Sequence, residues 1–195
     1  MNDLDLFKKN GFVVKKNLIS QPKINKINKI VNEVISKEKK RKKGNGANGT
    51  QSYDNYHFVY NSGSSKNKEI LRLNNPQNRH KIFYELSRDN KIISIAKKLL
   101  GGTVRFHLGK LNFKLPNKKK GSEIGWHQDW AFYPHTNDDL ITVGIYLDDC
   151  YEKNGPLKII KNSHKKKLYS HHNKENYFVG KIDTKKNKIG TKDSV

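Results

Sequence analysis

The chain has 195 residues and a formal net charge of +22, with 33% hydrophobic and 30% charged residues. This length fits one domain, and the single cysteine, Cys150, excludes an intramolecular disulfide and a cysteine-based zinc finger. The sequence shows neither an apolar signal core nor a stretch of about 20 apolar residues that could span a membrane, so we expect a cytoplasmic protein with no membrane partner.

The high positive charge raises the alternative of a nucleic-acid-binding protein, because basic chains gain affinity by releasing counterions from phosphates. However, five of the 40 basic residues are arginines, and the lysines are spread over the whole length. A recognition surface would be expected to contain more arginine, whose planar guanidinium suits phosphates and bases. We therefore do not expect nucleic acid as a partner, and we interpret the run from Lys37 to Lys43 as the solvated end of a helix.

The N-terminal region of the chain has mainly helical patterns. We predict a short helix from Asp3 to Lys9, a strand at Phe12–Val14, and a helix from Gln21 to Lys39 with Ser20 as its N-cap. Branched aliphatic residues in this last helix recur at three-to-four spacing, which predicts one buried stripe. The stripe consists of Ile24, Ile27, Ile30, Val31, Val34 and Ile35.

The next segment contains a glycine-rich loop at 44–49 and an aromatic strand from Tyr53 to Tyr60. Two helices are predicted to follow, from Pro76 to Ser87 and from Asn90 to Leu100, and Gly101–Gly102 is expected to close the second one.

From Thr103 onward the pattern has a period of two, which is typical of strands. It predicts strands at Thr103–Leu115 and Leu140–Leu147, with turns at Pro116–Asn117, Asn137–Asp138 and Asn154–Gly155. Helices followed by strands indicate an α+β fold, with the helices packed outside a sheet built mainly from residues after Thr103.

The segment that carries the most chemistry is His127-Gln128-Asp129, flanked by the two tryptophans of the chain, Trp126 and Trp130. Residues two apart on extended backbone point to the same side, so we expect both side chains on one face of a strand, not on a helix. An imidazole and a carboxylate that converge in this way can bind one metal ion. With a second histidine they form the 2-His-1-carboxylate triad of Fe(II) oxygenases.

The run from Trp126 to Lys165 strongly resembles the phytanoyl-CoA dioxygenase family, whose members are non-haem Fe(II) oxygenases that use 2-oxoglutarate. The segment His107–Pro116 and the opening Gly11–Val14 also look like the family. The matching elements are His127–Asp129, Phe132–Pro134, Leu140–Leu147, Asp148–Asp149, Asn154–Gly155 and Asn162–Lys165.

The resemblance implies a double-stranded β-helix, a jelly-roll, cupin-like core with N-terminal helices outside it. It implies one domain over 1–195, incomplete at its C-terminus, with a mainly helical region at 1–102 and a β-rich catalytic region at 103–180. It further implies Fe(II) as the metal, 2-oxoglutarate as co-substrate, dioxygen and a small organic or acyl substrate, with ascorbate as an accessory reductant.

Carried over to this chain, the resemblance makes His127 and Asp129 the first two metal ligands. Lys110 and Asn112, on the strand before them, become candidates to contact 2-oxoglutarate, and Arg72 is a further candidate. For Lys110 and Asn112, a solvent-facing polar alternation is the alternative interpretation.

The family's distal histidine and 2-oxoglutarate arginine would follow the region 177–180, where this sequence offers no strand with an inward histidine. We do not expect another histidine of this chain to replace the distal ligand. The histidines considered are His57, His80, His107, His135, His164, His171 and His172. We therefore expect the chain alone to be feeble or inactive. The missing segment has three explanations: a shortened or frameshifted gene product, a second polypeptide that supplies the missing strands, or an incomplete sequence. The alternative functions are an inactive remnant or a partner-binding module on the same scaffold.

Overall fold

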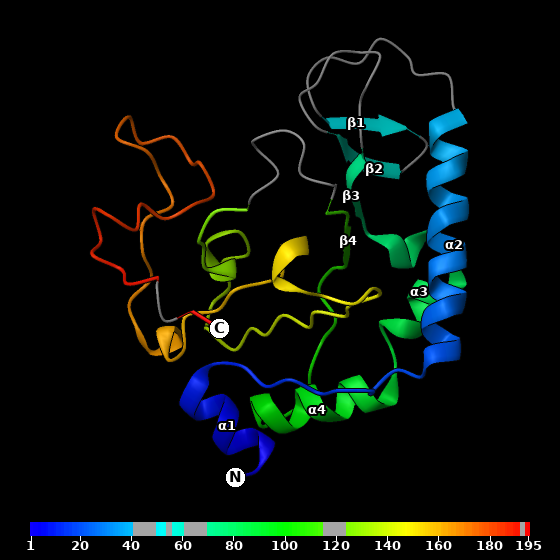
Figure 1. Ribbon diagram of the computed structural model, residues 1–195. Helices are drawn as coiled ribbons and strands as arrows, with labels where there is room; N and C mark the ends of the chain where they lie inside the picture. Colours follow the sequence, from blue (N-terminus) through cyan, green and yellow to red (C-terminus); the bar gives the residue numbers. More distant parts are fainter. Residues whose placement is uncertain (41–49, 54–55, 61–69, 115–123, 192–193) are drawn as a thin grey trace.

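A computed structural model of the chain describes residues 1–40, 50–53, 56–60, 70–114, 124–191 and 194–195. The predicted glycine-rich loop at 44–49 and the predicted turn at Pro116–Asn117 lie outside the described residues. The described residues form both helices and a sheet (Figure 1), which confirms the expectation of a mixed helical and β structure.

Four α-helices are present among the described residues: α1 (Asp3–Asn10), α2 (Gln21–Lys40), α3 (Lys81–Leu86) and α4 (Asn90–Leu100). The Asp89 side chain accepts a hydrogen bond from the Lys91 N–H and caps α4, whose C-terminal end is closed by Gly101 in the left-handed region. α1 and α4 lie side by side at the bottom of Figure 1, and α2 runs along the right of the molecule.

The helix predicted from Pro76 to Ser87 is interrupted. Its first turn is a separate 3-10 helix, η1 (Pro76–Asn78), and α3 begins at Lys81. The interruption arises because His80 is extended and its Nδ1 accepts a hydrogen bond from the Ile82 N–H, which starts a new helix.

The main core lies between α2 and α3. Ile27 and Val31 of α2 pack against Ile82, Phe83 and Leu86 of α3, and all five side chains are buried. The stripe predicted for α2 therefore faces this core, as expected for one apolar face of a helix.

The sheet is an antiparallel meander in the order β1 (Thr50–Tyr53), β2 (Tyr56–Tyr60), β3 (Ile70–Asn74) and β4 (Lys110–Asn112). Leu73 of β3 is fully buried and lies opposite Leu111 of β4. Together with Ile70 it forms a buried cluster that packs against Val34 and Ile35 of α2. One face of β3 and β4 thus belongs to the core, so the residues on either side of Leu73 and Leu111 project from the other face.

The expected position of the sheet is wrong, because three of its four strands precede Thr103. A strand was predicted from Thr103 to Leu115. Among the described residues of this segment, residues 110–112 alone form a strand, which pairs with β3. The segments 12–14 and 140–147 are not strands either. Alternating polarity is a local property, whereas a strand also needs a partner strand for its hydrogen bonds.

The N-terminal helix is tied to a distant segment of the chain. The His164 ring donates from Nε2 to the Lys8 carbonyl at 3.2 Å, and the Asn162 N–H donates to the Asn10 carbonyl at 2.9 Å. Gly11, with φ at +87°, leaves no room for a side chain, because a Cβ there would lie 2.5 Å from the His164 ring. The end of α1 is therefore shaped by its contact with residues 162–164.

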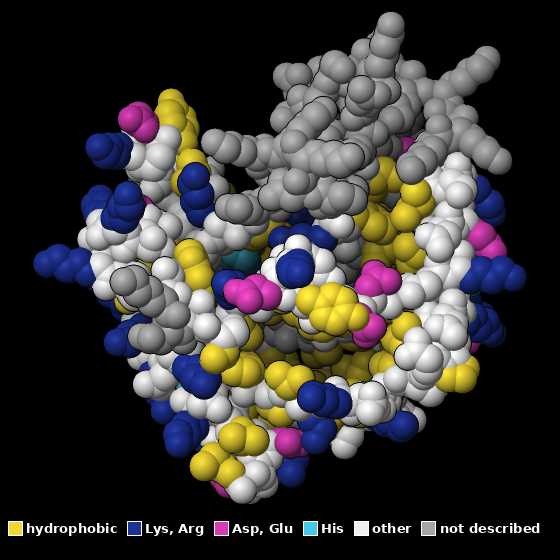
Figure 2. Space-filling model, in the orientation of Figure 1, with side chains coloured by type: hydrophobic (Ala, Val, Ile, Leu, Met, Phe, Trp, Pro, Cys, Tyr) yellow, Lys and Arg dark blue, Asp and Glu magenta, His cyan; other side chains and the backbone are white. Residues whose placement is uncertain are grey.

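Lys and Arg side chains are scattered over the face of the molecule shown in Figure 2, and hydrophobic side chains surround the hollow at its centre. Among the described residues, no helix combines the length and the apolar character that crossing a membrane would require.

Candidate metal centre

His127 and Asp129 converge as their spacing predicts. The His127 Nε2 atom lies 3.3 Å from the Asp129 Oδ1 atom, and the two side chains are 27% and 40% exposed. The backbone, however, is not the expected strand, because Asp129 is the first residue of the short 3-10 helix η2 (Asp129–Ala131). The two side chains still share one side because the residue between them, Gln128, is extended, with φ at −116° and ψ at 126°.

The orientation of the His127 ring leaves Nε2 available for a metal. Nδ1 lies 2.8 Å from the Gly125 carbonyl oxygen, which can only accept, so Nδ1 carries the proton and donates it. Nε2 points toward Asp129: when it is protonated it donates to Oδ1, and a metal ion would take the place of that proton. Metal-binding histidines usually have this arrangement, in which the second ring nitrogen donates to a carbonyl or carboxylate.

Asp129 is held at its other oxygen. Its Oδ2 accepts a hydrogen bond from the hydroxyl of Thr142, which lies on the segment 140–147. The hydrogen bond from His127 holds the pKa of Asp129 below its usual value, with a further lowering from Thr142 and opposition from partial burial. The same carboxylate raises the pKa of His127. Asp129 is therefore an anion with one oxygen fixed and the other turned toward His127.

The donor atoms of this pair fit one divalent ion. Two ligand atoms that each lie about 2.1 Å from an ion, at right angles to each other, are about 3 Å apart. The separation of 3.3 Å needs little adjustment to reach this value. A third side-chain ligand is not in place, because the described residues include no group of three or more His, Cys, Asp or Glu side chains suited to a metal.

Three of the other histidines make contacts away from this pair. His171, which is 2% exposed, uses both ring nitrogens in hydrogen bonds, and His164 contacts the end of α1. His107 packs edge-on against Tyr133 and His135, with ring centroids 5.7 and 5.0 Å apart.

The three predicted co-substrate residues share one face of the sheet. Arg72 of β3 lies opposite Asn112 of β4, and Lys110 is two residues from Asn112 on the same strand. These positions alternate with core residues Leu73 and Leu111, so they project away from the core.

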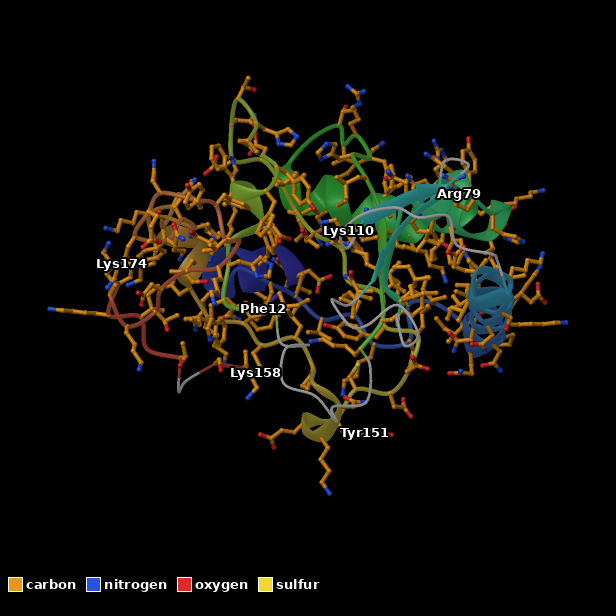
Figure 3. All side chains as sticks on the ribbon, turned by 90° about the horizontal axis from the view of Figure 1, so that it is seen from above. Phe12, Arg79, Lys110, Tyr151, Lys158 and Lys174 are labelled. Carbon is orange, nitrogen blue, oxygen red and sulfur yellow. The ribbon has the colours of Figure 1, made fainter. Side chains whose placement is uncertain are left out.

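This polar face is electrostatically coupled to the metal-ligand pair. Burial lowers the pKa of Lys110, the positive charge of Arg72 lowers it further, and the negative charge of Asp129 opposes both. The Lys110 ammonium also lies over the Tyr133 ring, 4.6 Å from its centroid. Figure 3 shows Lys110 near the middle of the molecule, whereas Lys174 is at its edge.

Arg72 has a buried atom that suits an anionic ligand. Its Nε has no hydrogen-bond partner within the described structure, and neither does Oδ1 of neighbouring Asn74. A buried N–H donor is normally paired, so an unpaired one marks a place where a ligand oxygen could bind. This atom and the Lys110 charge could together pair with a carboxylate group.

Sequence reasoning missed the residues that support the pair. Thr142 and Gly125 contact the ligand side chains, and His171 contacts the backbone between them. The sequence contained one signal, the glycine two residues before His127. No local pattern indicates His171, which lies 43 residues from its partner Gln128.

Comparison with known proteins finds similarity to a dioxygenase family and to individual dioxygenases and hydroxylases. The sequence model of the phytanoyl-CoA dioxygenase (PhyH) family matches residues 7–193. A probable alpha-ketoglutarate-dependent hypophosphite dioxygenase of Stutzerimonas stutzeri is 43% identical over 122 residues, which are 63% of this chain and 41% of that protein.

Two further relatives match over shorter stretches. The L-proline trans-4-hydroxylase of Streptomyces griseoviridis is 37% identical over 76 residues, covering 37% of this chain and 28% of the relative. The ectoine dioxygenase of Streptomyces coelicolor is 31% identical over 105 residues, covering 51% and 34%. The matched regions thus span less than half the length of each of these curated relatives.

Proposed function

This chain belongs to the phytanoyl-CoA dioxygenase family, and from that premise we propose that it takes part in the Fe(II)- and 2-oxoglutarate-dependent oxygenation of a small substrate. The observation that carries the proposal is the convergence of two potential ligand atoms, Nε2 of His127 and Oδ1 of Asp129, at a separation that fits one metal ion. The names of the relatives, which act on hypophosphite, L-proline or ectoine, support a small substrate. Ascorbate as an accessory reductant and a cytoplasmic location stay predictions.

The roles of the residues follow from their contacts. His127 supplies a neutral nitrogen ligand, and the Gly125 carbonyl keeps the ring proton on the opposite nitrogen. Asp129 supplies an anionic oxygen ligand, and Thr142 restrains the rotation of its carboxylate. When bound, Fe(II) supplies the activation of dioxygen that no side chain can provide.

The polar face of β3 and β4 would hold the co-substrate. Lys110 and Arg72 place two positive charges on one face, and the unpaired Nε of Arg72 offers a donor to a carboxylate oxygen. Asn112, opposite Arg72, adds an amide on the same face. The chemistry of this set favours an anion that carries more than one carboxylate or carbonyl oxygen.

We further propose that the segment 103–180 contributes to a double-stranded β-helix, with the mainly helical segment 1–102 packed against it in one domain. Family membership supports this fold, as does the exposure of apolar side chains in a segment with few paired strands. Such side chains are found at Val143, Tyr146, Leu168, Tyr177 and Phe178. The same exposure favours a second candidate function, a partner-binding module in which another polypeptide covers these residues.

Metal stoichiometry separates the two functions. The purified chain is loaded anaerobically with Fe(II), desalted and analysed for iron, in parallel with His127→Ala and Asp129→Ala. One Fe(II) per chain, lost in both variants, supports the oxygenase. The absence of bound iron, or iron that both variants retain, would refute the metal site and leave the partner-binding module.

A further inference from the structure

Gln128, the residue between the two metal ligands, is held at three points by the segment 167–171. Its backbone N–H donates to Nε2 of His171 at 2.9 Å. Its side-chain amide donates to the Lys167 carbonyl at 3.1 Å and accepts from the Tyr169 N–H at 2.8 Å. Both the peptide and the side chain of Gln128 are therefore restrained.

His171 is in a single protonation and tautomeric state. Its Nδ1 lies 2.8 Å from the Tyr169 carbonyl oxygen, so Nδ1 carries the proton. Its Nε2 accepts the Gln128 N–H and must be unprotonated. His171 is 2% exposed and both of its ring nitrogens are hydrogen-bonded, so the ring cannot turn toward a metal without losing two hydrogen bonds.

The His171 ring is fixed by aromatic neighbours and by its own backbone. It stacks on Phe178 at a centroid distance of 6.3 Å and meets Phe132 edge-on at 6.0 Å. Its carbonyl accepts the Val179 N–H at 2.9 Å. Phe132 in turn packs edge-on against the ring of His127, at 5.5 Å. The ring of His171 thus belongs to a packed cluster that reaches the metal ligand.

The separation of the two ligand atoms depends on the conformation of Gln128. The ring of His127 is anchored on one side of this residue by Gly125, and the carboxylate of Asp129 on the other side by Thr142. Rotation of the Gln128 peptide would move the two anchored ends relative to each other. The hydrogen bond from the Gln128 N–H to His171 opposes this rotation.

We propose that His171 is a positioning residue, which holds the Gln128 peptide so that His127 and Asp129 present their donor atoms to one metal ion. The inference deepens the proposed function and rests on it. It gives His171 a role different from that of a third ligand: it acts through the backbone, outside the coordination sphere. Residues that orient ligands in this way typically change metal affinity by about 10- to 100-fold when replaced.

The test replaces His171 by glutamine or by asparagine, whose side-chain amides extend to different distances from the backbone. The side-chain amide of His171→Gln reaches the position of Nε2, where its oxygen can accept the Gln128 N–H. The amide of His171→Asn reaches no further than the position of Nδ1. Anaerobic titration with Co(II), followed by visible absorption, gives the affinity and the coordination spectrum. His172→Asn is the matched control, because His172 is the exposed neighbour whose ring contacts Phe178.

We expect His171→Asn to weaken Co(II) binding at least about 10-fold. His171→Gln should restore most of the affinity, and His172→Asn should leave it unchanged. Equal affinities for the two His171 variants would overturn the proposal. So would an intact affinity in a folded His171→Asn protein, with folding checked by circular dichroism.

Amide hydrogen exchange provides a second measurement that needs no metal. The Gln128 amide should exchange slowly in the parent chain and in His171→Gln, and faster in His171→Asn. Fast exchange in the parent chain would refute the restraint itself. If the parent chain does not bind Co(II) but its Gln128 amide exchanges slowly, the proposed function is refuted, whereas the restraint by His171 is supported.

Discussion

The hydroxyl group of Thr142 is the side-chain donor that holds Oδ2 of Asp129, so replacing it tests the metal centre without changing a proposed ligand. Thr142→Val keeps the shape of the side chain and removes the donor. The Asp129 carboxylate can then rotate away from His127, and its negative charge loses a hydrogen bond. A hydrogen bond to a charged group contributes about 1.5–3 kcal/mol, and the exposure of this site favours the lower end.

The metal-free protein has the same hydrogen bond, so the effect on metal binding comes from the lost orientation of the carboxylate. Groups that orient ligands in this way change metal affinity by about 10- to 100-fold, and we expect a Co(II) affinity about 10-fold weaker. Isothermal titration under anaerobic conditions measures the change, with Thr142→Ser as the variant that keeps the hydroxyl. Thr103→Val is a control at an exposed threonine outside the site. The reasoning is refuted if Thr142→Val binds Co(II) as tightly as the parent chain, or if Thr142→Ser is weakened as much as Thr142→Val.

Three further outcomes are expected. Gly125→Ala should lower the melting temperature, at a cost of about 1–3 kcal/mol, because its Cβ would lie 2.9 Å from the Cβ of Lys181; Gly102→Ala, with open space around it, should be neutral in the same thermal scan. Asp89→Asn keeps the helix cap but loses the pair with Lys23, whose hydrogen bond is the main cause of the lowered pKa of Asp89. A folded-state pKa below the unfolded value stabilises the protein above the unfolded pKa, near 3.8, and this contribution is lost as the pH falls through the folded value. Urea unfolding at pH 7 should therefore show a loss of up to about 1 kcal/mol in Asp89→Asn, and the difference should vanish in strong acid; a difference that persists there would contradict the assignment. Finally, the chain alone should release succinate from 2-oxoglutarate far more slowly than an L-proline trans-4-hydroxylase assayed in parallel, and comparable rates would show that a complete site forms without help.

The helices could be predicted because their signals are local. The stripe of α2 contains the buried residues Ile27 and Val31, and α4 runs between Asn90 and Leu100 as the sequence indicates. The prediction of one continuous helix from Pro76 to Ser87 was wrong, because the side chain of His80 caps a new helix that begins at Lys81. A side-chain hydrogen bond to the backbone competes there with continuation of the helix.

The strands and the site show where local patterns stop being sufficient. The alternation in Leu140–Leu147 was interpreted as a strand, but pairing depends on a partner that the pattern does not specify. The convergence of His127 and Asp129 could be predicted, since it depends on one extended residue between them. The restraint by His171 could not be predicted, because it comes from 43 residues away in the sequence.

The contact between α1 and residues 162–164 has a consequence for the order of folding during synthesis. The Lys8 carbonyl and the His164 ring are 156 positions apart in the sequence, and closing so long a loop is entropically costly and slow. A ribosome that adds about 5–20 residues per second needs about 8–30 s to reach His164 after it has made α1. The contacts of α1 with residues 162–164 therefore form late, long after α1 itself has been made.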